Sequence, residues 1–290
     1  MSYRVTGLPN FRAFGAVVEG VDLRKQVSEE VVRFIKRDLL KHRLLIFRGQ
    51  GQVSGQRQVE VSEWWGPVES TFSKHPRSPH EDVFRVSNDP EEGCTHVGRS
   101  GWHIDGTFMP KPFRIQTMHF WSCPDQGGGT LFAPLKEIAL SLKEDAGPGA
   151  LDFDLLYFAT RRRSDDALLH PILCAHPETG EDAMVFHLGR HFMDAIVEAP
   201  GGGGGGQPRV LSSEETASVV EALRSRCEDP AWCLSYDWSP GDFAIVDNLA
   251  LAHYASPSTQ ADRRRAGLRV LHRTTVRGEH RPAKAQARPR

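Results

Sequence analysis

Short segments rich in β-branched and aromatic residues recur along this chain, and they constrain its fold more than any other feature. From residue 83 onward, each segment spans only a few residues and is separated from the next by Gly, Pro or Asp. Such punctuation is typical of strands joined by turns in a barrel or a jelly roll. The segments are VFRVSN, WHIDGTF, FRIQTMHFW (113–121), TLFAPL (130–135), AMVFHL, DFAIVDN and LRVLHRTTV.

Helical spacing interrupts this series. Ser28 precedes EEVVRFIKRDLLKHR, where apolar residues recur at helical intervals after an acidic first turn, so we predict a helix capped by Ser28. Two more helices are predicted at about 136–144 and 213–227, a short hairpin at 12–24 and a buried strand at 44–50. We therefore predict an α+β protein with a double-stranded β-helix (jelly roll) core and flanking helices.

The charge balance and the cysteine content limit the possible partners and the cellular compartment. The 36 Lys and Arg nearly balance the 37 Asp and Glu, which gives no argument for binding nucleic acid or an anionic membrane. Five cysteines, odd in number and without a CxxC pair, predict a reducing compartment rather than a disulfide framework or a zinc finger. Without a signal-peptide core or a long apolar stretch, we expect a soluble, cytoplasmic protein. Its partner is expected to be a small molecule, and the chain is compatible with a homo-oligomer.

Domain organisation follows from length and low-complexity segments. The 290 residues suffice for one large core, and we expect residues 1–278 to form a single domain. GGGGGGQP (201–208) is expected to be a flexible surface loop, because ordering each Gly loses much backbone entropy. The tail at 279–290 is basic and contains Pro, so we expect it to be disordered.

A His-x-Asp pair and a distant histidine suggest a metal site. His103 and Asp105 lie in GWHIDGTF, and His253 lies much later in VDNLALAHYA. On a strand, the side chains of the pair would share one face, with Ile104 facing the core. Because the chain has 13 histidines, the spacing by itself favours a structural or surface role. However, two imidazoles and one carboxylate can hold non-haem Fe(II) and leave the opposite face open, so convergence of the three would indicate an oxygenase.

Arginines in the last predicted strand suggest a co-substrate. Arg269 and Arg273 alternate with apolar residues, so both guanidinium groups should project to one face. A buried arginine needs an anion, and one beside Fe(II) suits the distal carboxylate of 2-oxoglutarate. Thr130, after the glycines at 127–129, could donate a hydrogen bond to a ligand carboxylate. The alternative is a solvated basic run, which we favour for residues 263–265.

The ordered motifs resemble the taurine dioxygenase (TauD/TfdA) family of Fe(II)- and 2-oxoglutarate-dependent dioxygenases over nearly the whole chain. The resemblance implies that His103, Asp105 and His253 bind iron. It also implies that Arg269 and Thr130 bind 2-oxoglutarate, with Fe(II) as cofactor and O2 as oxidant. It is carried by FGAVVEGVDL, LLKHRLLIFRGQ, WHIDGTF, GGGTLFAPL, HPILCAHPETGEDAMVF, WSPGDFAIVDNLALAHYA and RVLHRTTVRG.

One departure from the family pattern concerns the co-substrate arginine. In the family this arginine follows the second histidine by roughly eleven residues, whereas Arg269 lies 16 residues after His253. We interpret SPSTQADRRRAG as an insertion. By count alone Arg264 is the candidate, but the surrounding RVLHRTT favours Arg269. Trp102 and Asn248 also fit the family pattern.

The substrate side matches less well. Arg273 matches an arginine that in some members binds the acidic group of the substrate. Arg99, Arg190, His187 and His191 are further candidates to line a positively charged pocket for an acidic or amino-acid-like molecule. A surface position beside the glycine loop is equally open for the two histidines. The residues of the taurine enzyme's sulfonate pocket are not reproduced after WWGPVE, so taurine is not the expected substrate.

The predicted reaction is an oxidation, most simply a hydroxylation, with release of succinate and CO2. Because Asp105 fills a metal position, chloride has no vacant place, which disfavours halogenation. Two alternatives remain: a non-catalytic jelly-roll binding protein, and a cupin-type metal-dependent lyase or hydrolase. The presence of three ligands argues against the first, and a 2-oxoglutarate arginine would be unnecessary in the second.

Overall fold

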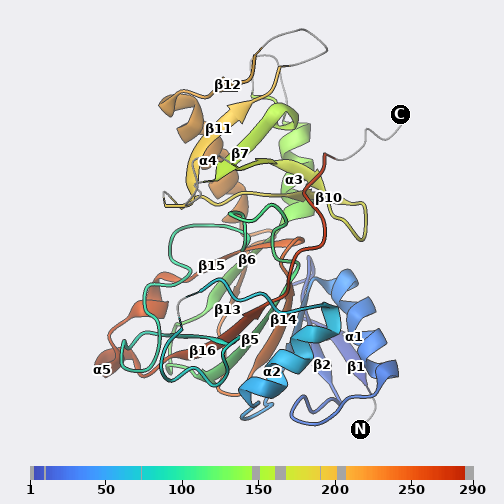
Figure 1. The fold of residues 1–290 in the computed structure, drawn as a ribbon, viewed down its shortest axis with the longest axis vertical. Coiled ribbons are helices and arrows are strands. Elements are labelled where there is room, and N and C mark those ends of the chain that lie inside the picture. Colours follow the sequence, from blue (N-terminus) through green and yellow to red (C-terminus); the bar gives the residue numbers. More distant parts are fainter. Residues whose placement is uncertain are drawn as a thin grey trace.

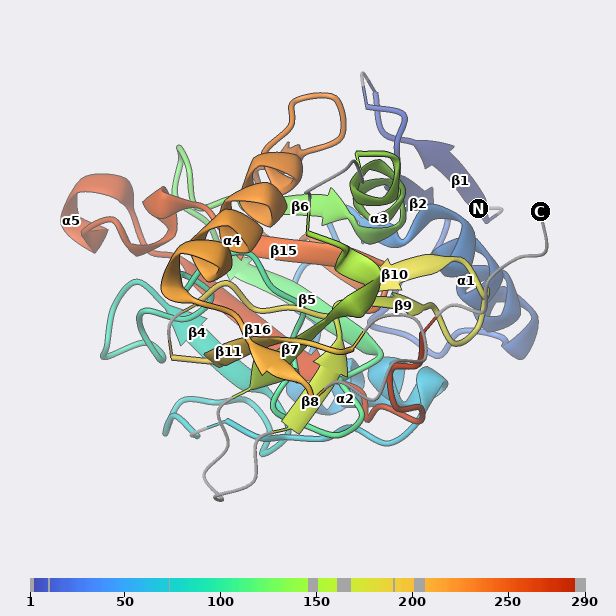
Figure 2. The ribbon, with the colours of Figure 1, turned by 90° about the horizontal axis from the view of Figure 1, so that it is seen from above.

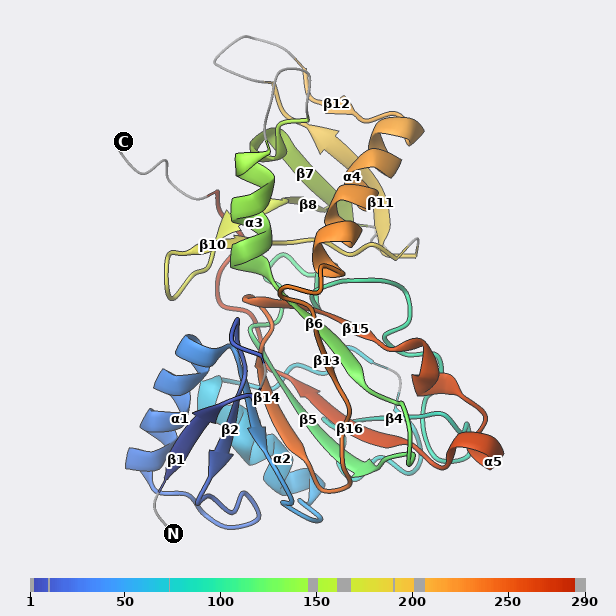
Figure 3. The same ribbon diagram turned by 180° about the vertical axis from the view of Figure 1, so that it is seen from behind.

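Two facing sheets form the centre of the molecule. The computed structural model describes residues 3–9, 11–72, 74–145, 151–160, 168–189, 191–200 and 207–284. The main sheet has the order β1 (Arg4–Gly7), β2 (Ala16–Glu19), β3 (Leu44–Phe47), β14 (Phe243–Asp247), β5 (Ile115–Ser122), β16 (Val270–Thr275) and β4 (Phe84–Ser87). The facing sheet has the order β13 (Leu234–Tyr236), β6 (Thr130–Pro134) and β15 (Leu251–Ala255) (Figure 3).

Two central strands of the main sheet, β3 and β14, are apolar on both faces. In β3, Leu44 and Ile46 pack into the cluster between the two sheets, whereas Leu45 and Phe47 pack against the helices on the outer side. β14 follows the same alternation. A strand covered on both faces reads as a continuous apolar run, which explains the LLIF and FAIV segments. The arrangement is the predicted jelly-roll core.

Helices of the N-terminal third cover the outer face of the main sheet (Figure 1). α1 (Glu29–His42) begins after Ser28, whose hydroxyl accepts a hydrogen bond from Val31 N, as predicted. α2 (Gly55–Ser62) was not predicted, because its sequence GQRQVEVS is largely polar; the structure buries its polar side chains against the sheet.

A second lobe stands above the two sheets (Figures 1 and 2). Its helices α3 (Leu135–Glu144) and α4 (Ser213–Cys227) agree with the predicted segments. They share a core with Trp102 and Ile104, so the segment that carries the His-x-Asp pair is packed against this lobe. The lobe's strands are β12 (Arg209–Val210), β11 (Met193–Glu198), β7 (Leu156–Thr160), β8 (Leu168–Pro171), β9 (Leu173–Ala175) and β10 (Asp182–Met184). The shorter helical segments of the molecule are η1 (Glu63–Trp65), η2 (Phe153–Leu155), η3 (Pro257–Gln260) and α5 (Arg263–Ala266).

Two local predictions were wrong. WHIDGTF is not a strand: His103 makes only isolated bridges, and the following residues form turns. Local alternation cannot reveal this, because a ladder also needs a partner along its whole length. The N-terminal hairpin pairs β1 with β2 rather than lying within 12–24, where the stretch before β2 is a bend.

The C-terminal segment makes specific contacts at 279–284. Ala175 N donates a 2.9 Å hydrogen bond to Ala283 O, and Lys284 Nζ donates one of 2.6 Å to Asp154 O. This part of the expected disordered tail therefore contacts the second lobe. Residues 285–290 of the tail and 201–206 of the expected glycine loop lie outside the described residues. None of the helices in the described ranges is long and apolar enough to cross a membrane.

Candidate active site

Main-chain pairing brings the two candidate histidine ligands together. His103 N donates to His253 O at 3.2 Å, and His253 N donates to His103 O at 2.9 Å. This reciprocal pair joins the His103 segment to β15 and places the two imidazole centroids 4.4 Å apart. Both side chains are buried, with 3% of His103 and 7% of His253 exposed. The prediction that the distant histidine meets the first is confirmed.

Asp105 completes the cluster. Its Oδ1 lies 3.7 Å from His103 Nε2, and its Oδ2 lies 3.8 Å from His253 Nε2. One ligand atom from each of the three residues lies within 4.8 Å of the others. The nitrogen–oxygen separations exceed a normal hydrogen bond, so the three groups surround a point rather than bond to each other.

The protonation states suit metal binding. Burial lowers the pKa of both imidazoles, that of His253 to about 3, and keeps them neutral. Burial would raise the pKa of the Asp105 carboxyl, but Arg273 and the histidines lower it to about 2. Arg273 Nη1 donates to Asp105 Oδ2 at 2.7 Å. The set is thus two neutral imidazoles and one carboxylate at neutral pH.

The tautomer of His103 supports the same conclusion. Its Nδ1 lies 2.6 Å from the carbonyl oxygen of Gly101, which can only accept, so Nδ1 carries the proton. The lone pair is then on Nε2, which faces Asp105. This orientation of a ligating histidine by a carbonyl is common in metal sites. The donor set therefore fits a divalent transition metal with open positions, as non-haem Fe(II) requires.

The side chain of Asn248 holds the main chain of Asp105 from both sides. Its Oδ1 accepts from Asp105 N at 2.8 Å, and its Nδ2 donates to Asp105 O at 3.0 Å. The same amide accepts from Gln116 Nε2 at 2.9 Å and donates to Phe113 O at 2.5 Å. Asn248 is fully buried, so water cannot replace these bonds. Asp105 lies in a turn, and this amide fixes it where a strand ladder does not.

Arg269 and Thr130 make up a second polar cluster, linked through the stacked rings of Phe120 and Trp238. Arg269 is 4% exposed; its Nε donates to Gly128 O at 2.9 Å, and its Cζ lies 5.9 Å from the centroid of the Phe120 ring. Burial lowers the pKa of Arg269 to about 10. Thr130 Oγ1 accepts from Trp238 Nε1 at 3.0 Å, which leaves the hydroxyl hydrogen to donate. Among the described residues, no carboxylate pairs with this guanidinium.

The glycine turn before Thr130 allows this close approach. Gly128 has φ of +76°, and a Cβ there would lie 2.8 Å from Pro124 Cγ and 3.3 Å from Arg269 Cδ. A Cβ on Gly129 would lie 2.5 Å from Asp237 Oδ1. A side chain at Gly128 would therefore displace Pro124 or Arg269 itself, and one at Gly129 would displace Asp237.

Arg273 and Arg269 both point into the apolar cluster between the two sheets, Arg273 over Phe84 and Arg269 over Phe120, so they share a face as predicted. Its Cζ is 5.3 Å from the centroid of the Phe84 ring, and Phe72 stacks on Phe84 with centroids 4.5 Å apart. Its Nε is buried without a hydrogen-bond partner in the described part of the chain. Arg273 thus lies between the carboxylate of Asp105 and the stacked Phe84 and Phe72 rings, and its Nε remains free to donate a hydrogen bond.

The remaining candidate substrate and co-substrate residues differ in burial. Arg99 is exposed on a loop, Arg264 is exposed in α5, and His191 is exposed. Arg190 lies outside the described residues. His187 is not at the surface: it is 4% exposed, and its ring stacks on His103 with centroids 4.4 Å apart.

The roles of Asn248 and His187 could not be read from their spacing. Asn248 stood out only as part of the family-like VDN motif, and nothing in the sequence indicates that its amide reaches Asp105. His187 reaches His103 through an isolated bridge between remote segments. Side chains that bond to distant main-chain atoms leave no periodic signal.

A jelly roll with two histidines and one carboxylate between its sheets defines the class of non-haem iron oxygenases. The chain matches the model of the family described as "Taurine catabolism dioxygenase TauD, TfdA family" over residues 4–275, and it belongs to that family. It is accordingly a 2-oxoglutarate-dependent non-haem iron dioxygenase that uses Fe(II), 2-oxoglutarate and O2.

Individual members of the family and solved structures are similar to this chain over most of its length. An alkylsulfatase from Acinetobacter baylyi is 27% identical, and the alignment covers 91% of this chain and 82% of that protein. A (S)-phenoxypropionate/alpha-ketoglutarate-dioxygenase from Sphingobium herbicidovorans is 26% identical, with 87% and 89% covered. The crystal structure of a taurine dioxygenase from Burkholderia xenovorans superposes with a TM-score of 0.74 at 26% identity, covering 99% of this chain and 95% of that one. The predicted family and fold are confirmed.

Proposed function

We propose that the protein hydroxylates a small organic anion with an apolar body. The observation that carries this proposal is the position of Arg273. Its guanidinium contacts Asp105 at 2.7 Å, lies against the stacked Phe84 and Phe72 rings, and retains a buried Nε donor without a partner. A cation beside an aromatic wall suits a substrate whose acidic group sits next to an alkyl or aryl body.

Each polar cluster has a role in this proposal. His103, Asp105 and His253 hold the ferrous ion, and Arg269 and Thr130 bind the distal carboxylate of 2-oxoglutarate. When bound, the iron together with 2-oxoglutarate and O2 supplies the oxidation of an unactivated C–H bond, with release of succinate and CO2. The chain's own residues supply position: two buried, neutral imidazoles, with the Nε2 lone pair of His103 facing Asp105, and a carboxylate held by Asn248.

Arg269 is better suited than Arg264 to bind the co-substrate. Arg269 is buried with its terminal nitrogens unpaired among the described residues, and Thr130, two residues after Gly128 at the start of β6, offers a hydroxyl donor. Arg264 is solvated in α5, where a carboxylate would gain little over water. The prediction for Arg269 is therefore retained as part of this proposal.

The named relatives support an organic anion. They include an alkylsulfatase, a sulfate ester dioxygenase and dioxygenases of phenoxypropionate and 2,4-dichlorophenoxyacetate. An amino-acid-like substrate is less well supported, because its ammonium group needs an anion and Asp105 is already paired with Arg273. Cys123, Cys174, Cys227 and Cys233 are free thiols, which supports a cytoplasmic location.

Substrate-dependent succinate formation tests the proposal. The protein would be incubated with Fe(II), ascorbate, 2-oxoglutarate and a panel of alkyl sulfates, aryloxyalkanoates, alkanesulfonates and α-amino acids. We expect succinate and an oxygenated or cleaved product with one or more of the first three classes. Arg273→Ala should raise KM for that substrate while leaving the affinity for 2-oxoglutarate unchanged. Turnover restricted to amino acids would contradict the proposed substrate class, and product without succinate would indicate a lyase or hydrolase.

A further inference from the structure

The loop at 256–267, which we interpret as an insertion (the inserted loop), connects His253 to Arg269, and both the main-chain N and the main-chain O of Arg269 are hydrogen-bonded outside it. Arg269 precedes β16, so it receives no support from that strand's ladder. The pairing of β16 with β5 is also irregular between Val270 and Leu271. Something other than the sheet must therefore fix the residue that emerges from the loop.

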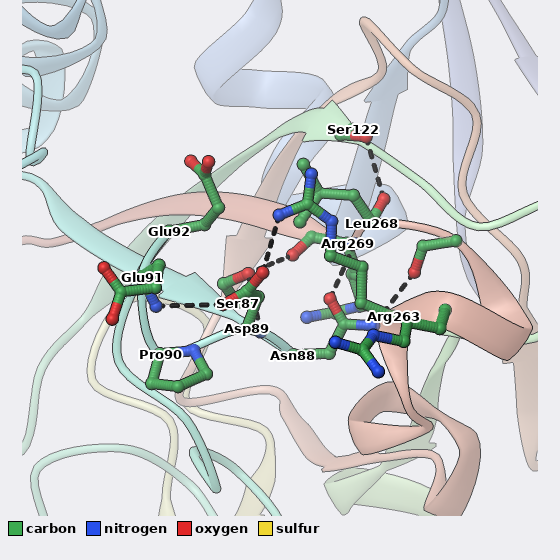
Figure 4. A network of polar contacts seen from close by, with 12 residues as sticks. Ser87, Asn88, Asp89, Pro90, Glu91, Glu92, Ser122, Arg263, Leu268 and Arg269 are labelled. Carbon is green, nitrogen blue, oxygen red and sulfur yellow. Dashed lines mark hydrogen bonds and ion pairs between the residues drawn. The ribbon is translucent and has the colours of Figure 1, made fainter.

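Asn88, which follows β4, supplies this support (Figure 4). Its Oδ1 accepts a hydrogen bond from Arg269 N at 2.9 Å. Its Nδ2 donates to two carbonyl oxygens of the loop, those of Ala261 at 2.9 Å and Gly267 at 3.0 Å. One amide therefore joins the middle of the loop, the end of the loop and the arginine.

Ser87, the last residue of β4, holds the main-chain oxygen of Arg269. Its Oγ donates to Arg269 O at 2.7 Å, and Asn88 N donates to the same oxygen at 3.4 Å (Figure 4). Together with the bond from Arg269 Nε to Gly128 O at 2.9 Å, these contacts determine both the position and the direction of the side chain.

We propose that Asn88 is the positioning residue for the co-substrate arginine, closing the inserted loop onto the end of β4 so that Arg269 points at the carboxylate of 2-oxoglutarate. The inference rests on the proposed role of Arg269. A flexible loop would otherwise spread the guanidinium over many positions, and ordering it would weaken binding. Asn88 does not touch the co-substrate in this proposal; it acts through Arg269.

The test uses the affinity of the Mn(II)-loaded protein for 2-oxoglutarate, measured calorimetrically without O2. Asn88→Ala should raise Kd for 2-oxoglutarate about tenfold, within the range of one or two hydrogen bonds. It should leave Kd for Mn(II) unchanged. It should also leave Kd unchanged for 2-oxobutyrate, a keto acid that lacks the distal carboxylate. Arg263→Ala is the matched control: it removes the exposed ion pair with Asp89 in the same network but does not contact Arg269.

A double variant separates this inference from the proposed function. If Asn88 acts through Arg269, Asn88→Ala should have no further effect in an Arg269→Ala background. Equal weakening of both keto acids, or no effect where Arg269→Ala has a large one, would overturn the positioning role. If Arg269→Ala itself leaves Kd for 2-oxoglutarate unchanged, the proposed co-substrate site and this inference both fail. Should Asn88→Ala not fold, Ser87→Ala removes one bond to Arg269 O and gives the same comparison.

Discussion

Replacing Asn248 by Ala should weaken both the fold and the metal site. The substitution removes four buried hydrogen bonds, two to the main chain of Asp105 and one each to Phe113 O and Gln116 Nε2. At about 1 kcal/mol net for each bond, the free energy of unfolding should fall by about 4 kcal/mol. Because the turn that carries the carboxylate loses its support, affinity for Mn(II) should fall by about 10- to 100-fold.

Two measurements and a control test this reasoning. Urea denaturation of the metal-free protein gives the change in unfolding free energy, and calorimetric titration gives the affinity for Mn(II). Gln58→Ala is the control, because Gln58 is also a buried amide but bonds to Thr117 Oγ1 and His272 O on the outer face of the main sheet. It should lose stability and keep its affinity for Mn(II). Equal losses of metal affinity in both variants would refute the specific role of Asn248.

Three further outcomes are expected. Asp105→Ala should abolish substrate-coupled succinate formation and Mn(II) binding; retained binding would remove the carboxylate from the ligand set. Arg269→Ala should raise Kd for 2-oxoglutarate by about 10- to 150-fold, the equivalent of a charge-assisted pair of about 1.5–3 kcal/mol, whereas Arg264→Ala should not; the reverse result would place the co-substrate carboxylate at Arg264. Burial opposes protonation of His176, but its 3.1 Å bond to Asp247 raises the pKa of His176 above 6.5. That stabilisation is complete below about pH 6.5 and is lost as pH rises through the raised pKa, so His176→Gln should shift the urea midpoint more at acidic than at alkaline pH, and a pH-independent shift would contradict the assignment.

Much of the fold was predictable because its signals are local. The cap at Ser28, the helix at 213–227 and the apolar strands of the main sheet each follow from spacing within a short window. α2 escaped prediction because its buried face is polar: Gln58 and Ser62 bond to the sheet instead of packing apolar groups against it. The sequence contains no periodic apolar pattern there to detect.

The candidate site was predictable in its chemistry but not in its support. His103, Asp105 and His253 are residue types that bind metals, so the sequence predicts a ligand set if the three side chains converge. The structure shows that they do. The expected strand around His103 was wrong, and the alignment of the pair depends instead on Asn248 and on the bridge to His253. Such bonds join remote segments through single main-chain atoms, and no spacing rule encodes them.

The proposed reaction depends on one arrangement: His103, Asp105 and His253 around a single metal ion, with 2-oxoglutarate bound by Arg269. A crystal structure of the anaerobic protein with Fe(II) and 2-oxoglutarate, with anomalous data at the iron edge, tests it most directly. We expect one iron peak bounded by the Nε2 atoms of both histidines and the Asp105 carboxylate, and the distal carboxylate of 2-oxoglutarate against Arg269 and Thr130. An iron peak elsewhere, or the distal carboxylate bound at Arg264, would contradict it.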